Sequence, residues 1–125
     1  MTDKTATIKQ LKDAVLKWRN ERNWSKHHSP KNLAVSIAVE AAELLEHFQW
    51  DDYKNNYDKK EIERELADII IYCLFFASTN KIDITKSVIE KLDYISKKYP
   101  VGIFNHNGGN LNKYYKIKKS YRKSK

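Results

Sequence analysis

The chain has 125 residues, 24 Lys/Arg against 16 Asp/Glu and a formal net charge of +8, which is the size of one domain. Three Gly and two Pro are too few for a turn-rich sandwich or barrel, and the single Cys excludes a disulfide framework and a Cys-type zinc site. No apolar run reaches the ~20 residues that span a bilayer, and the first ten residues lack the apolar segment of a signal peptide. We therefore expect a soluble, cytoplasmic, all-α protein that does not bind membranes.

The first half of the chain contains two expected helices. Apolar residues recur on one face over about residues 5–22, which predicts the first helix. Ser29 followed by Pro30 is typical of an N-cap with proline at the first helical position. From this point a second helix can run to about Trp50 without another Gly or Pro.

The second half contains two more expected helices. Asp58 and Glu61 have capping-box spacing and predict a third helix to about Ser78. Asp83 is the expected N-cap of the fourth helix, which should end before residues 99–100 because the residue ahead of a proline avoids the α region. Short connections favour antiparallel packing, so we expect a four-helix core in which the second and third helices are the longest.

The C-terminal end of the chain carries most of the positive charge. Residues 111–125 contain seven Lys/Arg and no acid, which leaves about +1 for residues 1–110. We therefore divide the sequence into an all-α domain, 1–110, and a basic tail, 111–125. Such a tail attracts nucleic acid or another polyanion through long-range electrostatics. The alternative is a solvated terminus that only keeps the protein soluble.

The third expected helix carries carboxylates in an apolar setting. Residues 66–77 are apolar around nearly the whole helix, which predicts burial on most sides. Asp68 lies inside this run although Asp is a poor helix former and is costly to bury without a partner. Glu65, Asp68 and Tyr72 fall on one stripe at i, i+3 and i+7.

The second expected helix repeats this pattern with Glu40, Glu43 and His47. Two such helices would bring four carboxylates together, and like charges share a low-dielectric site only when protons or cations neutralise them. An all-oxygen ligand set selects hard cations, which indicates Mg²⁺ with Mn²⁺ as a substitute. The alternative is that one pair faces solvent. A di-iron centre is disfavoured because no His follows a Glu by three residues.

These residues carry a family resemblance. The pattern Glu40-x-x-Glu43 with Glu65-x-x-Asp68 resembles the ExxE…ExxD signature of the all-α nucleoside triphosphate pyrophosphohydrolases, the MazG-like group. The runs ERNWSKHHSPKNLAVSIAVEAAELLEHFQW, ERELADIIIYCLFFA and KLDYISKKYPV are similar to its single-domain dCTP pyrophosphatase type. The resemblance covers roughly residues 18–101.

The resemblance implies Mg²⁺-dependent hydrolysis of a dCTP-like or non-standard (deoxy)nucleoside triphosphate to monophosphate and pyrophosphate, in nucleotide pool sanitation. It implies that all four carboxylates hold the metal and that one glutamate orients or deprotonates the attacking water. It also implies a homodimer or homotetramer, which two largely apolar helices in a short chain independently favour.

Further side chains are candidates for substrate binding. Trp24, Trp50 and Tyr72 offer flat faces to a base, whereas ordinary core packing is the simpler explanation for Trp18. The remaining candidates are His28 and Asn32 for the base edge and Lys31, Lys91 and Lys98 for the phosphates.

One position departs from the family pattern. Ile95 stands four residues after Lys91, where the family commonly has Asn, which affects substrate identity more than reaction type. The competing hypothesis for the whole chain is a non-enzymatic helical module that binds nucleic acid through the basic tail.

Overall fold

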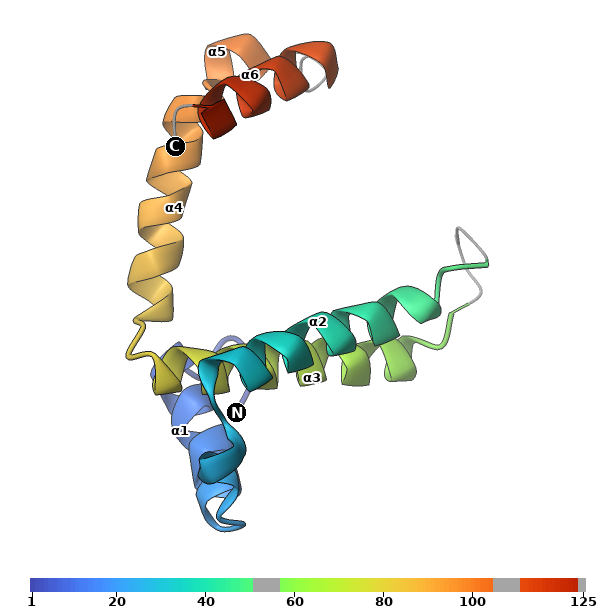
Figure 1. Cartoon of the computed structure of the whole chain (residues 1–125), viewed down its shortest axis with the longest axis vertical. Helices are drawn as coiled ribbons and strands as arrows, with labels where there is room; N and C mark the ends of the chain where they lie inside the picture. Colours follow the sequence, from blue (N-terminus) through green and yellow to red (C-terminus); the bar gives the residue numbers. More distant parts are fainter. Residues whose placement is uncertain (51–56, 105–110, 124–125) are drawn as a thin grey trace. The chain divides into compact units, whose positions relative to one another are not determined.

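The computed structural model describes residues 1–50, 57–104 and 111–123, and all regular structure in these ranges is helical. The all-α prediction is therefore confirmed. The chain forms two compact units, residues 1–83 and 84–125, which we describe separately. The first contains α1 (Ile8–Asn20), the 3₁₀ helix η1 (Trp24–His27), α2 (Pro30–Glu46) and α3 (Lys59–Thr79), and the second contains α4 (Ile84–Lys98), α5 (Val101–Phe104) and α6 (Leu111–Lys123) (Figure 1).

Local capping defines where the helices of the first unit begin. Ser29 Oγ accepts a hydrogen bond from the Asn32 backbone N–H at 3.1 Å, and Pro30 occupies the first turn of α2 as predicted. At the start of α3, the Asp58 carboxylate accepts from the backbone N–H groups of Lys60 and Glu61. Both predicted caps are therefore confirmed.

The two longest helices, α2 and α3, run antiparallel and side by side (Figure 1). The His28 ring, just before α2, lies 4.7 Å from the Phe75 ring near the end of α3. At the opposite end, the rings of Phe48 and Tyr57 lie 5.3 Å apart. This packing places Glu40 and Glu43 of α2 beside α3.

The buried apolar core of the first unit is small. Among the described residues it consists of Leu33, Leu74, Phe75 and Ala77, which lie where the start of α2 meets the end of α3. Farther along α3, Leu66 is 51% exposed and Ile70 is 42% exposed. The prediction that this helix is buried on most sides is therefore wrong for the single chain, because its own elements cover only the C-terminal half.

The α2 helix ends earlier than the sequence predicts. It stops at Glu46, four residues before Trp50, and the backbone N–H of Phe48 bonds the Leu45 carbonyl in a tightened last turn. The Phe48 ring then packs against Tyr57. This contact joins residues nine positions apart that do not share a helix, so helical periodicity did not reveal it.

In the second unit, α4 begins directly after Asp83 and ends at Lys98, in agreement with the prediction. Residues 111–123 form the helix α6, although the lysine-rich sequence predicted only a basic tail there. Side chains of α6 pack against the α4 segment: Tyr114 stacks on Tyr99 at 5.1 Å, and Tyr121 meets Tyr94 edge-on at 5.9 Å. In the described ranges, no helix has the length and apolar character needed to cross a membrane.

Candidate metal centre and aromatic pocket

Three glutamates from two helices converge in the first unit. Glu40 and Glu43 lie one helical turn apart on α2, and Glu65 lies on the neighbouring α3. Each offers a carboxylate oxygen, and the three oxygens lie within 4.8 Å of one another. The antiparallel packing of α2 and α3 therefore forms an acidic cluster, the name we use for these three residues.

The negative charges of the acidic cluster repel one another, as the pKa of Glu40 shows. The pKa of Glu40 is raised to about 7, first by burial and then by a hydrogen bond and the negative charge of Glu43. The charges of Asp68 and Glu65 act in the same direction. A carboxyl group with this pKa is close to half-protonated at neutral pH, because its charged form is disfavoured by burial beside other carboxylates.

Two carboxylate oxygens of the cluster have no partner. Glu40 Oε2 and Glu65 Oε2 are buried and accept no hydrogen bond within the part of the chain that the structure describes. Buried carboxylate oxygens are normally paired, and leaving them unpaired costs stability. Three converging glutamates, two of them with an unpaired buried oxygen, fit the requirements of a hard divalent cation.

His47 contacts the acidic cluster at the end of α2. Its Nε2 lies 3.4 Å from Glu65 Oε1, and both side chains are largely buried, with 26% and 19% exposed. The sequence placed His47 on the acidic stripe but gave it no role. Because an imidazole beside a metal-binding carboxylate can fix its orientation, His47 is a positioning candidate that the sequence analysis missed.

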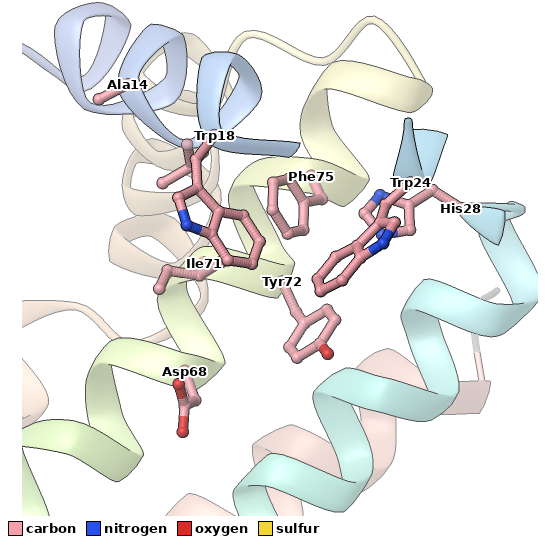
Figure 2. Close-up of a pocket in the computed structure, with 9 residues that line it drawn as sticks. Ala14, Trp18, Trp24, His28, Asp68, Ile71, Tyr72 and Phe75 are labelled. Atoms are coloured by element: carbon pink, nitrogen blue, oxygen red, sulfur yellow. The ribbon is translucent and has the colours of Figure 1, made fainter. Parts of the chain in front are cut away.

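An aromatic pocket of about 430 Å³ adjoins the acidic cluster. Figure 2 shows side chains of α1, η1 and α3 around it, with Asp68 on the α3 side. The rings of Trp18 and Trp24 meet edge-on at 5.2 Å, and those of Tyr72 and Phe75 meet edge-on at 6.0 Å. The lining residues are Ala14, Val15, Trp18, Trp24, His28, Asp68, Ile71, Tyr72 and Phe75.

A short polar turn positions η1 and its aromatic residue. Asn23 adopts a left-handed conformation with φ of 55°, which Asn tolerates better than most residues, and Trp24 follows it directly. The Asn32 side chain donates a hydrogen bond to the His27 carbonyl at 3.2 Å, which ties the end of η1 to α2. This bond holds Trp24 and His28 at the pocket.

His28 faces the pocket as a neutral imidazole. Burial lowers its pKa, and the positive charges of Arg19 and His27 lower it further. Its Nδ1 is buried and makes no hydrogen bond within the described residues. The pocket thus combines stacking surfaces with one unsatisfied ring nitrogen.

Comparison with known proteins identifies the family. The model of the MazG-like family matches residues 35–116, a range that contains all three glutamates of the acidic cluster. The chain belongs to the MazG-like family. A crystal structure of a pyrophosphatase from Archaeoglobus fulgidus shares 38% sequence identity and a TM-score of 0.71, over 80% of this chain and 98% of that one. The MazG-like fold is therefore shared with a solved structure.

Curated relatives extend this likeness. Rat dCTP pyrophosphatase 1 is 30% identical over 102 residues, which cover 76% of this chain and 60% of the relative. Human dCTP pyrophosphatase 1 is 28% identical over 101 residues, covering 75% and 59% respectively. The chain thus spans about 60% of the length of these curated relatives.

The structure brings some sequence-derived candidates of this MazG-like chain together. Glu40, Glu43 and Glu65 form the acidic cluster, and Asp68 lies close enough to act on Glu40 while also lining the pocket. The pocket also contains three of the candidates for binding the base, namely Trp24, His28 and Tyr72.

Other candidates lie elsewhere. Asn32 holds the η1 turn rather than lining the pocket, Lys31 is exposed in the first turn of α2, and Trp50 is 89% exposed. Lys91 and Lys98 belong to the second unit, so their roles stay predictions. Lys91 Nζ lies 4.8 Å from the Tyr94 ring, and Lys98 Nζ lies near Tyr99 and Tyr121.

Trp18 was assigned to ordinary core packing, and this assignment is wrong. The side chain is 44% exposed and lines the pocket beside Trp24. Arg22 covers its other side, with the guanidinium carbon 4.2 Å from the ring centroid. The sequence predicted the helix correctly, but no residue of α1 is fully buried, and Trp18 near its end lines the pocket instead.

Proposed function

We propose that this MazG-like chain is a nucleoside triphosphate pyrophosphohydrolase that uses a divalent cation, preferably Mg²⁺ with Mn²⁺ as a substitute. It would cleave between the α and β phosphorus atoms and release a monophosphate and pyrophosphate. The observation that carries this proposal is the pair of buried, unpartnered oxygens on Glu40 and Glu65, beside an aromatic pocket. Curated relatives named dCTP pyrophosphatase 1 support the same reaction class.

The carboxylates would supply the metal-binding side of the site. Glu40, Glu43 and Glu65 would hold the cation, and Asp68 would join them from the pocket wall. When bound, the cation would supply positive charge to offset the negative charge of the phosphate oxygens. One glutamate carboxylate orients the attacking water and accepts its proton, while His47 keeps Glu65 oriented towards the cluster.

The aromatic pocket would hold the base. Its volume of about 430 Å³ falls in the range of small-molecule sites, and Trp24 offers a partly exposed ring for stacking. His28, kept neutral by its surroundings, has one ring nitrogen unsatisfied. We propose a dCTP-like or non-standard (deoxy)nucleoside triphosphate as substrate, since the relatives are named for dCTP, and a role in nucleotide pool sanitation in the cytoplasm.

The proposed enzyme is a homodimer or a homotetramer. Large apolar side chains remain exposed on both long helices, including Val35 at 52%, Leu45 at 63% and Leu66 at 51%. An apolar groove between α1 and α3 adds to this surface, lined in part by Leu11 and Ile70. Exposed apolar surface of this kind favours self-association.

Product analysis tests the proposed reaction. Purified protein is incubated with a panel of ribo- and deoxyribonucleoside triphosphates, with Mg²⁺ or with EDTA, and the products are separated by ion-exchange chromatography. The expected result is metal-dependent formation of monophosphate and pyrophosphate, with the highest rate for a cytosine nucleotide. Diphosphate plus phosphate would contradict the bond assignment, and no turnover across the panel would contradict the enzyme.

A matched pair of variants ties the reaction to the cluster. Glu40→Gln keeps the size of the side chain but removes a charged ligand, and it should reduce turnover by at least ~100-fold. Glu46→Gln makes the same change on the same helix at an exposed position outside the cluster and should leave turnover unchanged. Equal activity of both variants would show that the acidic cluster is not the metal site.

A further inference from the structure

The net positive charge of the protein belongs to its second unit. Residues 84–125 contain eleven Lys/Arg and two acids, a net charge of +9, whereas residues 1–83 have a net charge of −1. Asp93 is the last acidic residue in the sequence, and its carboxylate lies 3.0 Å from Lys97. Nine Lys/Arg follow Asp93 in the sequence, and no Asp or Glu does.

The basic segment forms the amphipathic helix α6, whose apolar face packs within the second unit. Tyr114 stacks on Tyr99 with an interplanar angle of 20°, and Tyr121 contacts Tyr94 edge-on. Ile117 lies between Tyr114 and Tyr121 on the same helical face, and all three are half-buried. The apolar face of α6 is therefore already used in packing.

The opposite face of α6 carries a regular basic stripe. Lys116, Lys119 and Lys123 recur at spacings of three and four residues, which places them on one face, and all three are exposed. Tyr115 flanks this face and is 58% exposed. We call these three lysines the basic stripe.

We propose that α6 binds single-stranded nucleic acid, with the basic stripe on the phosphates and Tyr115 stacked on a base. Lysines repeated along one face match a chain that carries one negative charge per nucleotide, and an exposed aromatic ring offers sequence-tolerant stacking. A membrane surface is a poorer match because an interfacial helix inserts its apolar face, which on α6 packs against Tyr94 and Tyr99. This binding is separate from the proposed hydrolysis.

Fluorescence anisotropy with a labelled single-stranded DNA 20-mer of mixed sequence tests the proposal on the full chain. The expected affinity falls linearly with salt on a double-logarithmic plot. The triple variant K116Q/K119Q/K123Q should bind at least ~10-fold more weakly at low salt and lose about 2 from the slope, since each phosphate contact on a single strand contributes ~0.7. Tyr115→Ala should weaken binding ~10-fold and leave the slope unchanged.

A charge-matched control separates the stripe from net charge. K4Q/K9Q/K59Q removes the same charge at exposed positions of the first unit and should change the affinity less than ~2-fold. If both triple variants weakened binding of the 20-mer equally, the proposal would be overturned. It would also be overturned if the protein bound vesicles containing phosphatidylserine but not the 20-mer. Circular dichroism checks that the helix content of each variant is intact.

The two proposals can fail independently. Glu40→Gln should bind the 20-mer like the unmodified protein, because the acidic cluster lies on the other unit. The stripe variant should hydrolyse nucleotides at the unmodified rate. Loss of 20-mer binding in Glu40→Gln would overturn the assignment to α6, whereas a nucleotide panel without turnover would contradict only the proposed enzyme.

Discussion

Substitution of Glu40 by glutamine should make the metal-free protein more stable at alkaline pH. Folding raises the Glu40 pKa from 4.5 to about 7, so the folded chain binds a proton more tightly than the unfolded chain. The stability of the unmodified, metal-free protein is therefore highest below pH ~4.5, falls as pH rises towards ~7, and is lowest above that value. Glutamine carries no charge, so the Glu40→Gln variant does not lose stability in this way as the pH rises.

The shift in pKa sets the size of the effect. A pKa shift from 4.5 to about 7 corresponds to a loss of ~3 kcal/mol in the free energy of unfolding. Because the side chain is partly exposed, solvent screening reduces this loss to on the order of 2 kcal/mol. In a chain of 125 residues this amounts to a rise in melting temperature of ~5–10 °C at pH 8 in EDTA. At pH 4.5 the two proteins should melt within ~2 °C of each other.

Magnesium should reverse this order. Excess Mg²⁺ at pH 8 stabilises the unmodified protein by binding its folded state, and it should raise the melting temperature of Glu40→Gln much less. Thermal unfolding followed by circular dichroism gives the melting temperatures of the unmodified protein and of Glu40→Gln, each in EDTA and in Mg²⁺. Glu46→Gln is the control outside the cluster. A melting temperature for Glu40→Gln no higher than that of the unmodified protein in EDTA at pH 8 would refute the destabilising effect of the Glu40 charge.

Two further predictions concern the neighbours of the acidic cluster. Replacing His47 by Leu removes its contact with Glu65 and should weaken Mn²⁺ binding ~10-fold in calorimetry. Replacing His47 by Asn, which can still donate a hydrogen bond, should restore part of the affinity. Unchanged Mn²⁺ affinity in the Leu variant would exclude a positioning role for His47. Replacing Trp24 by Ala should raise KM for the best nucleotide ~10-fold and leave the Mg²⁺-induced rise in melting temperature unchanged. Replacing Trp24 by Phe should bring KM most of the way back. A fall in kcat without a change in KM would contradict base stacking.

Signals contained in a few adjacent residues predicted the helix boundaries well. Ser29 and Asp58 cap their helices because a side-chain oxygen reaches backbone N–H groups two or three residues away. The end of α4 at Lys98 follows from Pro100, which restricts the residue before it. Each of these features depends only on local geometry.

Features that depend on distant contacts were missed. The α6 helix packs through Tyr114 and Tyr121 on the rings of Tyr99 and Tyr94. The helical spacing of Tyr114 and Tyr121 is visible in the sequence, but it does not show that aromatic partners cover this face, and the lysine-rich composition led to the prediction of a tail. The contact between Phe48 and Tyr57 similarly accompanies the early end of α2. Sequence periodicity indicated which residues share a face but not which face a partner covers.

The acidic site was partly predictable because its residues are unfavourable where they stand. The stripes of Glu40 with Glu43 and of Glu65 with Asp68 conflict with their apolar surroundings, and this conflict is visible in the sequence. The contribution of His47 depends on its 3.4 Å contact with Glu65, eighteen residues away. That distance became known only from the packing of α2 against α3.

One face of α3 connects the two halves of the proposed site. Glu65, Asp68, Tyr72 and Phe75 follow one another at spacings of three or four residues, so they form a single stripe that is ~15 Å long. The carboxylates lie at one end of this stripe and the rings at the other, with Asp68 close to both. Because one rigid helix fixes the spacing, a substrate with phosphates at one end and a base at the other matches the site in length and in order. Inserting one residue between Asp68 and Tyr72 would rotate the rings by ~100° relative to the carboxylates and separate the two functions.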